Sequence, residues 1–272
     1  IWGFAFPLPR LLPQTTMPRR VEMLSMAVVL IEMNLVRGED NFGDTILHET
    51  FSDGPAGMAK SFANQGLAWF NEPTTWKSGH RDGKSLEIFM DNSTDFWRKS
   101  YYDPPFEHDN GHLLYFPTEE NVIVTTEFSL KGDLHQFDHG GLILRVNSEH
   151  WIKMGMEFAD NKRRLGAVVT NDFSQWSVQE WDFDPISIRL FRIKDEVVGE
   201  VFHPEKKEWV FFFVGHVTNA KAEPVKVGVF SASPLKQGSS AVFSFLKIQR
   251  CPKEGQCHSH YNGPPEEQKE EL

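Results

Sequence analysis

The chain has 272 residues, of which 40% are hydrophobic and 24% charged, and its formal net charge is −10 at pH 7. An acidic chain without a basic stripe is a poor binder of nucleic acid, so we exclude nucleic acid as a partner. The apolar content is enough to bury a core, and all-β sandwiches often use more than about 200 residues as one domain. The 23 Phe and 8 Trp residues suit both β-strands and sugar-binding surfaces.

Residues 1–40 are expected to form an N-terminal extension that is poorly ordered or a short helix. Prolines interrupt residues 1–14, and a basic group at 17–20 precedes an apolar run at 23–31, which is too short to span a bilayer. Because two cysteines do not make a disulfide framework, we expect a cytoplasmic protein. The alternative is that residues 23–31 are a signal segment of a secreted protein, and only then would the glycosylation sequon at Asn92 matter.

Residues 41–250 read as a series of short strands separated by turn residues. The expected strands are 45–52, 67–73, 86–90, 94–98, 122–130, 141–146, 151–158, 166–170, 186–193, 197–203, 209–214, 225–231 and 242–248. Many short strands without βαβ alternation favour one antiparallel sandwich or jelly-roll domain. Residues 101–110 predict a long loop, no helical stripe is convincing after the N-terminal extension, and residues 251–272 predict an acidic disordered tail.

The central stretch, residues 140–177, predicts three successive strands with two different faces. A period of two places one apolar set on a single face: Leu142, Leu144, Val146, Ile152, Met154, Met156 and Phe158. Trp151, Lys153 and Glu157 fall on the opposite face. We therefore expect one face in the core and the other decorated with charged and indole groups.

The order of several motifs resembles the regulation-of-enolase-protein family, a domain of unknown function with a concanavalin-A-like fold. The matching pieces include WFNEP with Trp76, DFWR at 95–98, QxDxGGL at 136–142, WIKxGxE at 151–157 and GxFxASP at 228–234. They cover residues 45–250 in order. The chain departs from the family pattern at His139 and Gln175, so a ligand role of those positions in relatives does not transfer.

The resemblance implies an all-β, concanavalin-A-like jelly-roll sandwich of two antiparallel sheets, with either metabolic regulation or an association with glycosides. We predict a non-enzymatic module that binds a carbohydrate or a protein segment on its polar concave face. The expected ligand-binding residues are Asn71, Trp97, Arg145, Trp151, Lys153, Glu157 and Trp176. The simpler interpretation is a solvated face on which Lys153 pairs with Glu157, and Arg145 with Glu127.

A glycoside hydrolase of the same fold is the alternative. Such enzymes need two facing carboxyl groups, about 5–5.5 Å apart for retention or about 6.5–9.5 Å for inversion. The candidates are Glu157 with Glu127 on a neighbouring strand, and Asp182 within the alternating acids of 180–184. That acidic run abuts Pro185, which favours a solvated loop.

No cofactor and no metal site are predicted. Cys251, Cys257, His258 and His260 are zinc-ligand types, but their spacing departs from the usual pattern and they lie in the expected tail. The sequence also lacks an EF-hand-type calcium loop and the glycine-rich loops that bind nucleotides.

Overall fold

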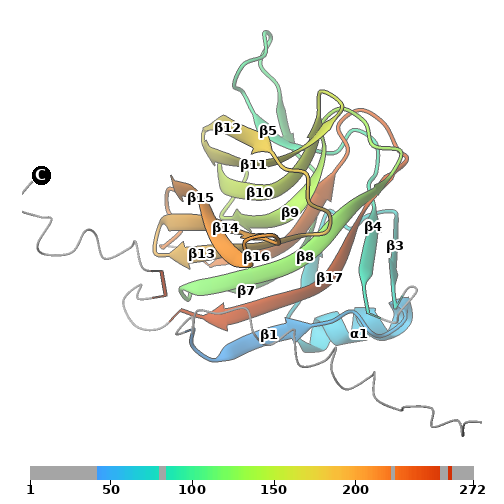
Figure 1. The fold of residues 1–272 in the computed structure, drawn as a ribbon, viewed down its shortest axis with the longest axis vertical. Coiled ribbons are helices and arrows are strands. Elements are labelled where there is room, and N and C mark those ends of the chain that lie inside the picture. The colour runs from blue at the N-terminus through green and yellow to red at the C-terminus, as the bar shows by residue number, and fades with distance from the viewer. Residues whose placement is uncertain (1–41, 80–83, 222–223, 252–256, 259–272) are drawn as a thin grey trace, which may run out of the picture. The chain divides into compact units, whose positions relative to one another are not determined.

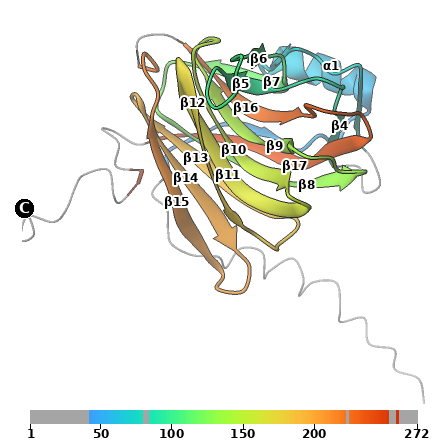
Figure 2. The same ribbon diagram turned by 90° about the horizontal axis from the view of Figure 1, so that it is seen from above.

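The computed structural model describes residues 42–79, 84–221, 224–251, 257 and 258, and two antiparallel sheets carry most of them (Figures 1 and 2). Sheet A has the order β15-β14-β13-β8-β17-β4-β3, with β1 also paired to β17. Its strands are β15 (Glu208–His216), β14 (Glu196–His203), β13 (Ile186–Ile193), β8 (Val122–Gly132), β17 (Ser239–Arg250), β4 (Leu86–Phe89), β3 (Thr75–Ser78) and β1 (Thr45–Glu49).

Sheet B has the order β12-β11-β10-β9-β16-β7-β2. Its strands are β12 (Phe173–Glu180), β11 (Lys162–Asn171), β10 (His150–Ala159), β9 (Asp138–Arg145), β16 (Val225–Ala232), β7 (His112–Thr118) and β2 (Ala68–Phe70). The strands β5 (Phe96–Arg98) and β6 (Glu107–Asp109) form a separate hairpin, whose connecting loop projects at the top of Figure 1. The predicted concanavalin-A-like sandwich of two antiparallel sheets is confirmed.

The main core lies between the two sheets and uses the alternation that the sequence predicts. From sheet B it contains Leu142, Leu144, Ile152, Met154 and Met156. Sheet A contributes, among others, the inward residues of β8, which are Val122, Val124, Phe128 and Leu130. Removing such apolar surface from water is the main stabilising contribution to a fold of this kind.

One helix and four strands were not expected from the sequence. The helix α1 (Pro55–Asn64) buries Met58 and Phe62, and a stripe of two residues is too short to recognise as helical periodicity. Strand β7 hides its alternation because Leu113 and Leu114 are buried on opposite faces of sheet B. The strands β3, β6 and β12 are short or largely exposed, so they carry little apolar pattern.

Three residues of the segment expected to be a tail are buried. Cys251 and Cys257 form a disulfide and cover Phe191 and Val198. His258 lies beside them, with its ring on Phe191 at 4.9 Å and its Nε2 3.1 Å from Glu200. The disulfide also removes the argument from reduced cysteines on which the cytoplasmic expectation rested. The rest of that segment and the expected extension at 1–40 lie outside the described residues.

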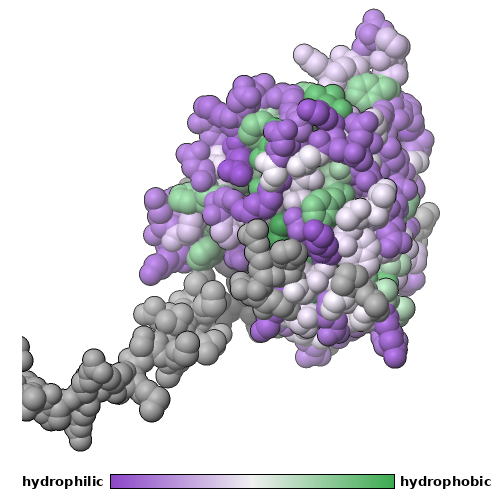
Figure 3. Space-filling model, turned by 90° about the vertical axis from the view of Figure 1, so that its right-hand side faces the viewer, coloured by the Kyte–Doolittle hydropathy of each residue, from purple (hydrophilic) through white to green (hydrophobic). Residues whose placement is uncertain are grey.

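The face drawn in Figure 3 is mainly hydrophilic, and its hydrophobic residues appear as separate spots. Where the structure describes the chain, no helix is long and apolar enough to cross a membrane. The described elements all belong to one unit within residues 38–272.

Candidate functional site

The β5–β6 hairpin lies on the face of sheet B that points away from the main core. A second apolar cluster fills the space beneath it: Phe96, Leu113, Ile143, Trp151, Val168 and Phe230. Trp151 is 0% exposed, and its ring lies 6.0 Å from that of Phe96 on the hairpin. This face of sheet B is therefore partly covered, whereas the sequence predicted an open, decorated surface.

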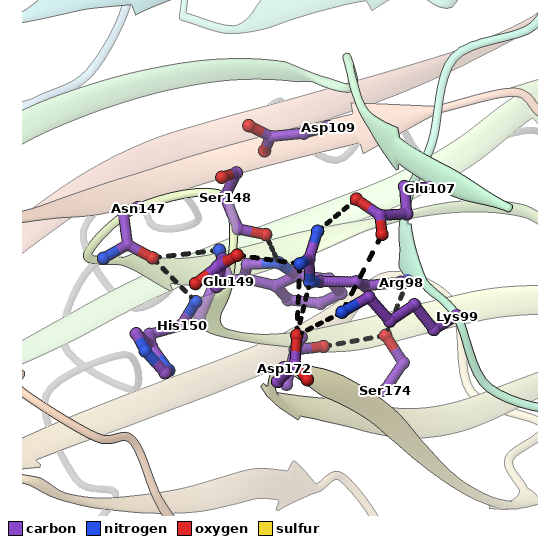
Figure 4. A network of polar contacts seen from close by, with 12 residues as sticks. Arg98, Lys99, Glu107, Asp109, Asn147, Ser148, Glu149, His150, Asp172 and Ser174 are labelled. Atoms are coloured by element: carbon purple, nitrogen blue, oxygen red, sulfur yellow. Dashed lines mark hydrogen bonds and ion pairs between the residues drawn. The ribbon is translucent and has the colours of Figure 1, made fainter.

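A cluster of ion pairs fastens the hairpin to sheet B (Figure 4). The guanidinium of Arg98 contacts Glu107 within the hairpin, Glu149 before β10 at 2.8 Å, and Asp172 before β12 at 3.1 Å. Lys99 adds a contact to Asp172 at 2.6 Å. These contacts join three segments far apart in sequence, so they set where the hairpin sits over the sheet.

A second attachment holds the far strand of the hairpin. The Arg145 guanidinium donates from Nε to Asp109 at 3.0 Å and lies 4.3 Å from the ring centroid of Phe70. The Asn71 amide donates to the carbonyl of Asp109 at 3.2 Å. Two predicted ligand-binding residues, Asn71 and Arg145, therefore hold the hairpin onto sheet B.

Between the hairpin loop and sheet B lies a pocket of about 470 Å³. Six aromatic residues contribute to its walls: Trp97, Tyr101, Tyr102 and Phe106 from the hairpin, Phe137 from the turn before β9, and Trp176 from β12. Polar groups are also present: Asp95, Gln136, His139, Lys153, Glu157, Asp160 and Ser174. An aromatic cavity with a few converging polar groups is the usual form of a small-molecule site.

A row of glycines crosses sheet B on the same face. Gly155 on β10 lies directly between Gly141 on β9 and Gly166 on β11. A Cβ at Gly155 would come within 2.1 Å of the carbonyl oxygen of Gly140, and a Cβ at Gly141 within 2.1 Å of that of Met154. Side chains are therefore excluded there, and only a small hollow of about 10 Å³ lies between Lys153 and Glu157.

Lys153 forms the centre of a buried polar cluster beside this space. Its ammonium donates to the Asp95 carboxylate at 3.2 Å, the Phe96 carbonyl at 2.7 Å and Nε2 of His139 at 2.9 Å. His139 Nδ1 lies 2.7 Å from the carbonyl of Phe137, which fixes the proton on Nδ1 and leaves Nε2 as the acceptor. All three N–H groups of the ammonium are thus used within the protein.

Burial and the neighbouring ammonium of Lys153 both lower the pKa of His139, to about 4, so this imidazole is neutral near pH 7. For Asp95, burial is the largest single influence and would raise the pKa, but the charges of Lys153 and His139 and the hydrogen bonds from Lys153 and the Phe96 backbone together lower it below its ordinary value. Asp95 therefore stays ionised.

The pKa of Glu157 is displaced in the direction opposite to that of Asp95. Burial raises its pKa to about 7, against the opposing attraction of Lys153, and the Asp95 carboxylate adds to the rise. The Trp176 indole N–H donates to the Glu157 carboxylate. The pocket thus combines an ionised carboxylate with a carboxyl group that exchanges its proton near neutral pH, which is a common property of functional sites.

Four of the seven predicted ligand-binding residues meet at the pocket: Trp97, Lys153, Glu157 and Trp176. Among the acids considered for catalysis, only Glu157 lies there. Glu127 is on β8 of sheet A, where it accepts from Ser187 and Ser244, so it cannot face Glu157 across one sheet. Asp182 follows the end of β12 and does not line the pocket.

Sequence reasoning missed the contribution of the hairpin loop and of Asp95. The signal is present in the aromatic run FWRKSYYDPPF at 96–106, for which the sequence predicts a strand followed by a long loop. The glycines at the centres of three adjacent strands were a second signal, because glycine within a strand often marks a close approach of backbone or ligand.

A sequence profile described as "Protein of unknown function (DUF1349)" matches residues 69–251. Regulation of enolase protein 1 of Saccharomyces cerevisiae is 26% identical over 178 residues, which are 65% of this chain and 85% of that protein. Uncharacterized protein AN7484 of Emericella nidulans is 26% identical over 171 residues, covering 57% of this chain and 80% of that one.

Two solved structures share the fold. A functionally unknown protein from Saccharomyces cerevisiae superposes with a TM-score of 0.59 at 24% identity, over 68% of this chain and 96% of that one. The GH43 protein BlXynB from Bacillus licheniformis superposes with a TM-score of 0.55 at 10% identity, over 75% of this chain and 39% of that one.

Proposed function

Since the chain belongs to the DUF1349 family of proteins of unknown function, whose description assigns no activity, we propose a role from the site itself: the chain binds a carbohydrate in the pocket under the β5–β6 hairpin. The supporting observation is the arrangement of Trp97, Tyr102, Phe106 and Trp176 around a cavity that also contains carboxylate and amide groups. Sugar rings stack on aromatic faces while their hydroxyls need such polar partners.

We further propose that binding serves regulation and not turnover. The relative named Regulation of enolase protein 1 supports a regulatory role for this chain. The hairpin loop that walls the pocket also exposes Tyr101, which is 93% accessible. A ligand that orders this loop would change a surface available to a protein partner, which is how occupancy of the pocket would be communicated.

Calorimetric titration with a panel of disaccharides tests the binding site. Trp176→Ala removes a partly exposed wall of the pocket and is expected to abolish measurable binding. A second variant, Glu157→Gln, removes the ionisable carboxyl group of the pocket. Trp151→Ala is unsuitable because Trp151 is fully buried and its loss would disturb the fold. Glu127→Gln, on sheet A, is the matched control and should bind as wild type. Unchanged binding by Trp176→Ala would refute the site.

A second candidate is glycoside hydrolysis, which one observation favours. Asp95 and Glu157 line the same pocket with pKa values displaced in opposite directions, as in an ionised carboxylate and a general acid. Release of reducing sugar should then be lost in both Asp95→Asn and Glu157→Gln. Release that persists in either variant would exclude that pair.

A further inference from the structure

Glu157 differs from the other acids of the pocket in its partners. Asp95 contacts the Lys153 ammonium at 3.2 Å, and Asp160 contacts the Arg164 guanidinium at 3.3 Å. Among the described residues, the carboxylate of Glu157 has the indole N–H of Trp176 as its hydrogen-bond donor and forms no ion pair. Of the described acids that line the pocket, it is therefore the one that forms no ion pair, although the ammonium of Lys153 is near enough to attract its charge.

None of the neighbouring elements that the structure describes pairs Glu157 with a cation. On β10 itself, the ammonium of Lys153 already makes three hydrogen bonds. Across β9 the opposite residue is His139, which is neutral, and across β11 it is Arg164, which donates to Asp160 and to the carbonyl of Ala159.

The remaining neighbours of Glu157 are not cationic either. Strand β12 presents the neutral indole of Trp176, and the hairpin presents Asp95 and the phenol of Tyr102. Within the described part of the chain no cation pairs with Glu157, so its carboxylate is available to a cation of a bound ligand.

We propose that the sugar bound in this pocket carries an amino group, whose ammonium contacts the carboxylate of Glu157 between the aromatic walls. This inference rests on the proposed carbohydrate binding and narrows it to amino sugars. A carboxylate and an ammonium form a charge-assisted hydrogen bond, which is about twice as strong as a neutral one. The rings of Trp97, Tyr102 and Trp176 offer π faces that attract the same cation and also stack on the sugar.

The proton equilibrium of Glu157 fits such an occupant. A carboxyl group with a pKa of about 7 is about half protonated near neutral pH, and an arriving ammonium favours the ionised form. A neutral sugar would give no such stabilisation of the charge. Binding of an amino sugar should therefore release a proton from Glu157, and binding of its neutral counterpart should not.

The test compares three β-1,4-linked disaccharides that differ at carbon 2: those of glucosamine, glucose and N-acetylglucosamine. At pH 7.5 we expect wild type to bind the glucosamine disaccharide roughly tenfold more tightly than either of the others. Glu157→Gln should lose this preference and bind all three alike, whereas Glu127→Gln should keep it.

The pH dependence gives a second measurement. Between pH 7.5 and pH 6 the ionised fraction of Glu157 falls about eightfold for a pKa of about 7. The affinity for the glucosamine disaccharide should fall in wild type, by less than that factor because the sugar amine itself gains a proton over the same range, and should stay flat in Glu157→Gln. Affinity for the glucose disaccharide should stay nearly constant in both.

The outcomes separate the two proposals. Equal affinity for the three disaccharides in wild type would overturn the amino-sugar inference and leave carbohydrate binding standing. A preference for glucosamine that survives in Glu157→Gln would overturn the assignment to Glu157. If none of the three binds, the proposed function falls, and the inference falls with it.

Discussion

Replacement of Lys153 by methionine tests the buried cluster that positions the pocket. Lys153 is 6% exposed, and its ammonium is held by Asp95, His139 and the Phe96 carbonyl. Methionine keeps much of the side-chain length but leaves the Asp95 carboxylate without its cation and two acceptors without a donor. Breaking a buried ion pair by removing one partner typically costs about 3–5 kcal/mol. We expect Lys153→Met to lose about that amount of unfolding free energy at pH 7.5.

The pH dependence of this loss has a definite sign. In wild type the pKa of Asp95 is lowered, because Lys153 and the other groups around the carboxylate together outweigh the effect of burial. Its contribution to stability is therefore present above its unfolded pKa and is lost as the pH falls through the folded pKa. Without Lys153, burial raises that pKa, and Asp95 takes up a proton in the folded state as the pH falls. His139, relieved of the neighbouring ammonium, can also protonate and pair with Asp95, which is 3.6 Å away. The loss caused by Lys153→Met should therefore be smaller at pH 5 than at pH 7.5.

Urea denaturation followed by tryptophan fluorescence at pH 7.5 and pH 5 measures both effects. The double variant Lys153→Met with Asp95→Asn should recover part of the loss, because it removes the stranded charge. Lys162→Met is the matched control, since Lys162 pairs with Glu180 where both side chains are more than half exposed, and its midpoint should not move. A loss below about 1 kcal/mol at pH 7.5, or one that grows at pH 5, would refute this account of the cluster.

Three further predictions concern the pocket, the hairpin and the disulfide. Since burial raises the pKa of Glu157 to about 7, its ionised form disfavours the folded state above that pH. Glu157→Gln should therefore stabilise the protein by about 1–2 kcal/mol at pH 8 and give no benefit at pH 4. Thermal unfolding at both pH values measures this. Arg98→Met removes the centre of the ion-pair cluster in Figure 4, so hydrogen exchange should accelerate in the hairpin and stay unchanged in β8. Exchange in the hairpin that is as slow in the variant as in wild type would contradict the role of that cluster. Cys257→Ser opens a loop with a sequence separation of 6 and should cost about 2 kcal/mol, which a reducing agent should reproduce in wild type but not in the variant.

The sequence was sufficient for the sandwich because its main strands bury one face each. The alternation through Ile152, Met154 and Met156 is strict, and each of these residues lies in the main core. The same alternation placed Lys153 and Glu157 on the opposite face, where the structure has them. Local periodicity alone is sufficient to assign each of these residues to one face of its strand.

The covering of that opposite face could not be predicted. Phe96 and Trp151 are 55 residues apart, and nothing local to either shows that the hairpin returns over sheet B to bury both. The predicted pairing of Arg145 with Glu127 was wrong for the same reason. Arg145 pairs with Asp109 of the hairpin, and the strand that carries Glu127 belongs to the other sheet. Pairings across layers depend on where the chain returns, which a pattern within one strand does not encode.

The glycine row across β9, β10 and β11 limits how sheet B can be altered beside this pocket. Any side chain placed at Gly141 or Gly155 would collide with the adjoining strand. Substitutions meant to reshape the cavity therefore belong among its lining residues, such as Tyr101, Tyr102 and Trp176, and not at these glycines. The close backbone approach of β9 and β10 is thus a fixed part of the scaffold in any such redesign.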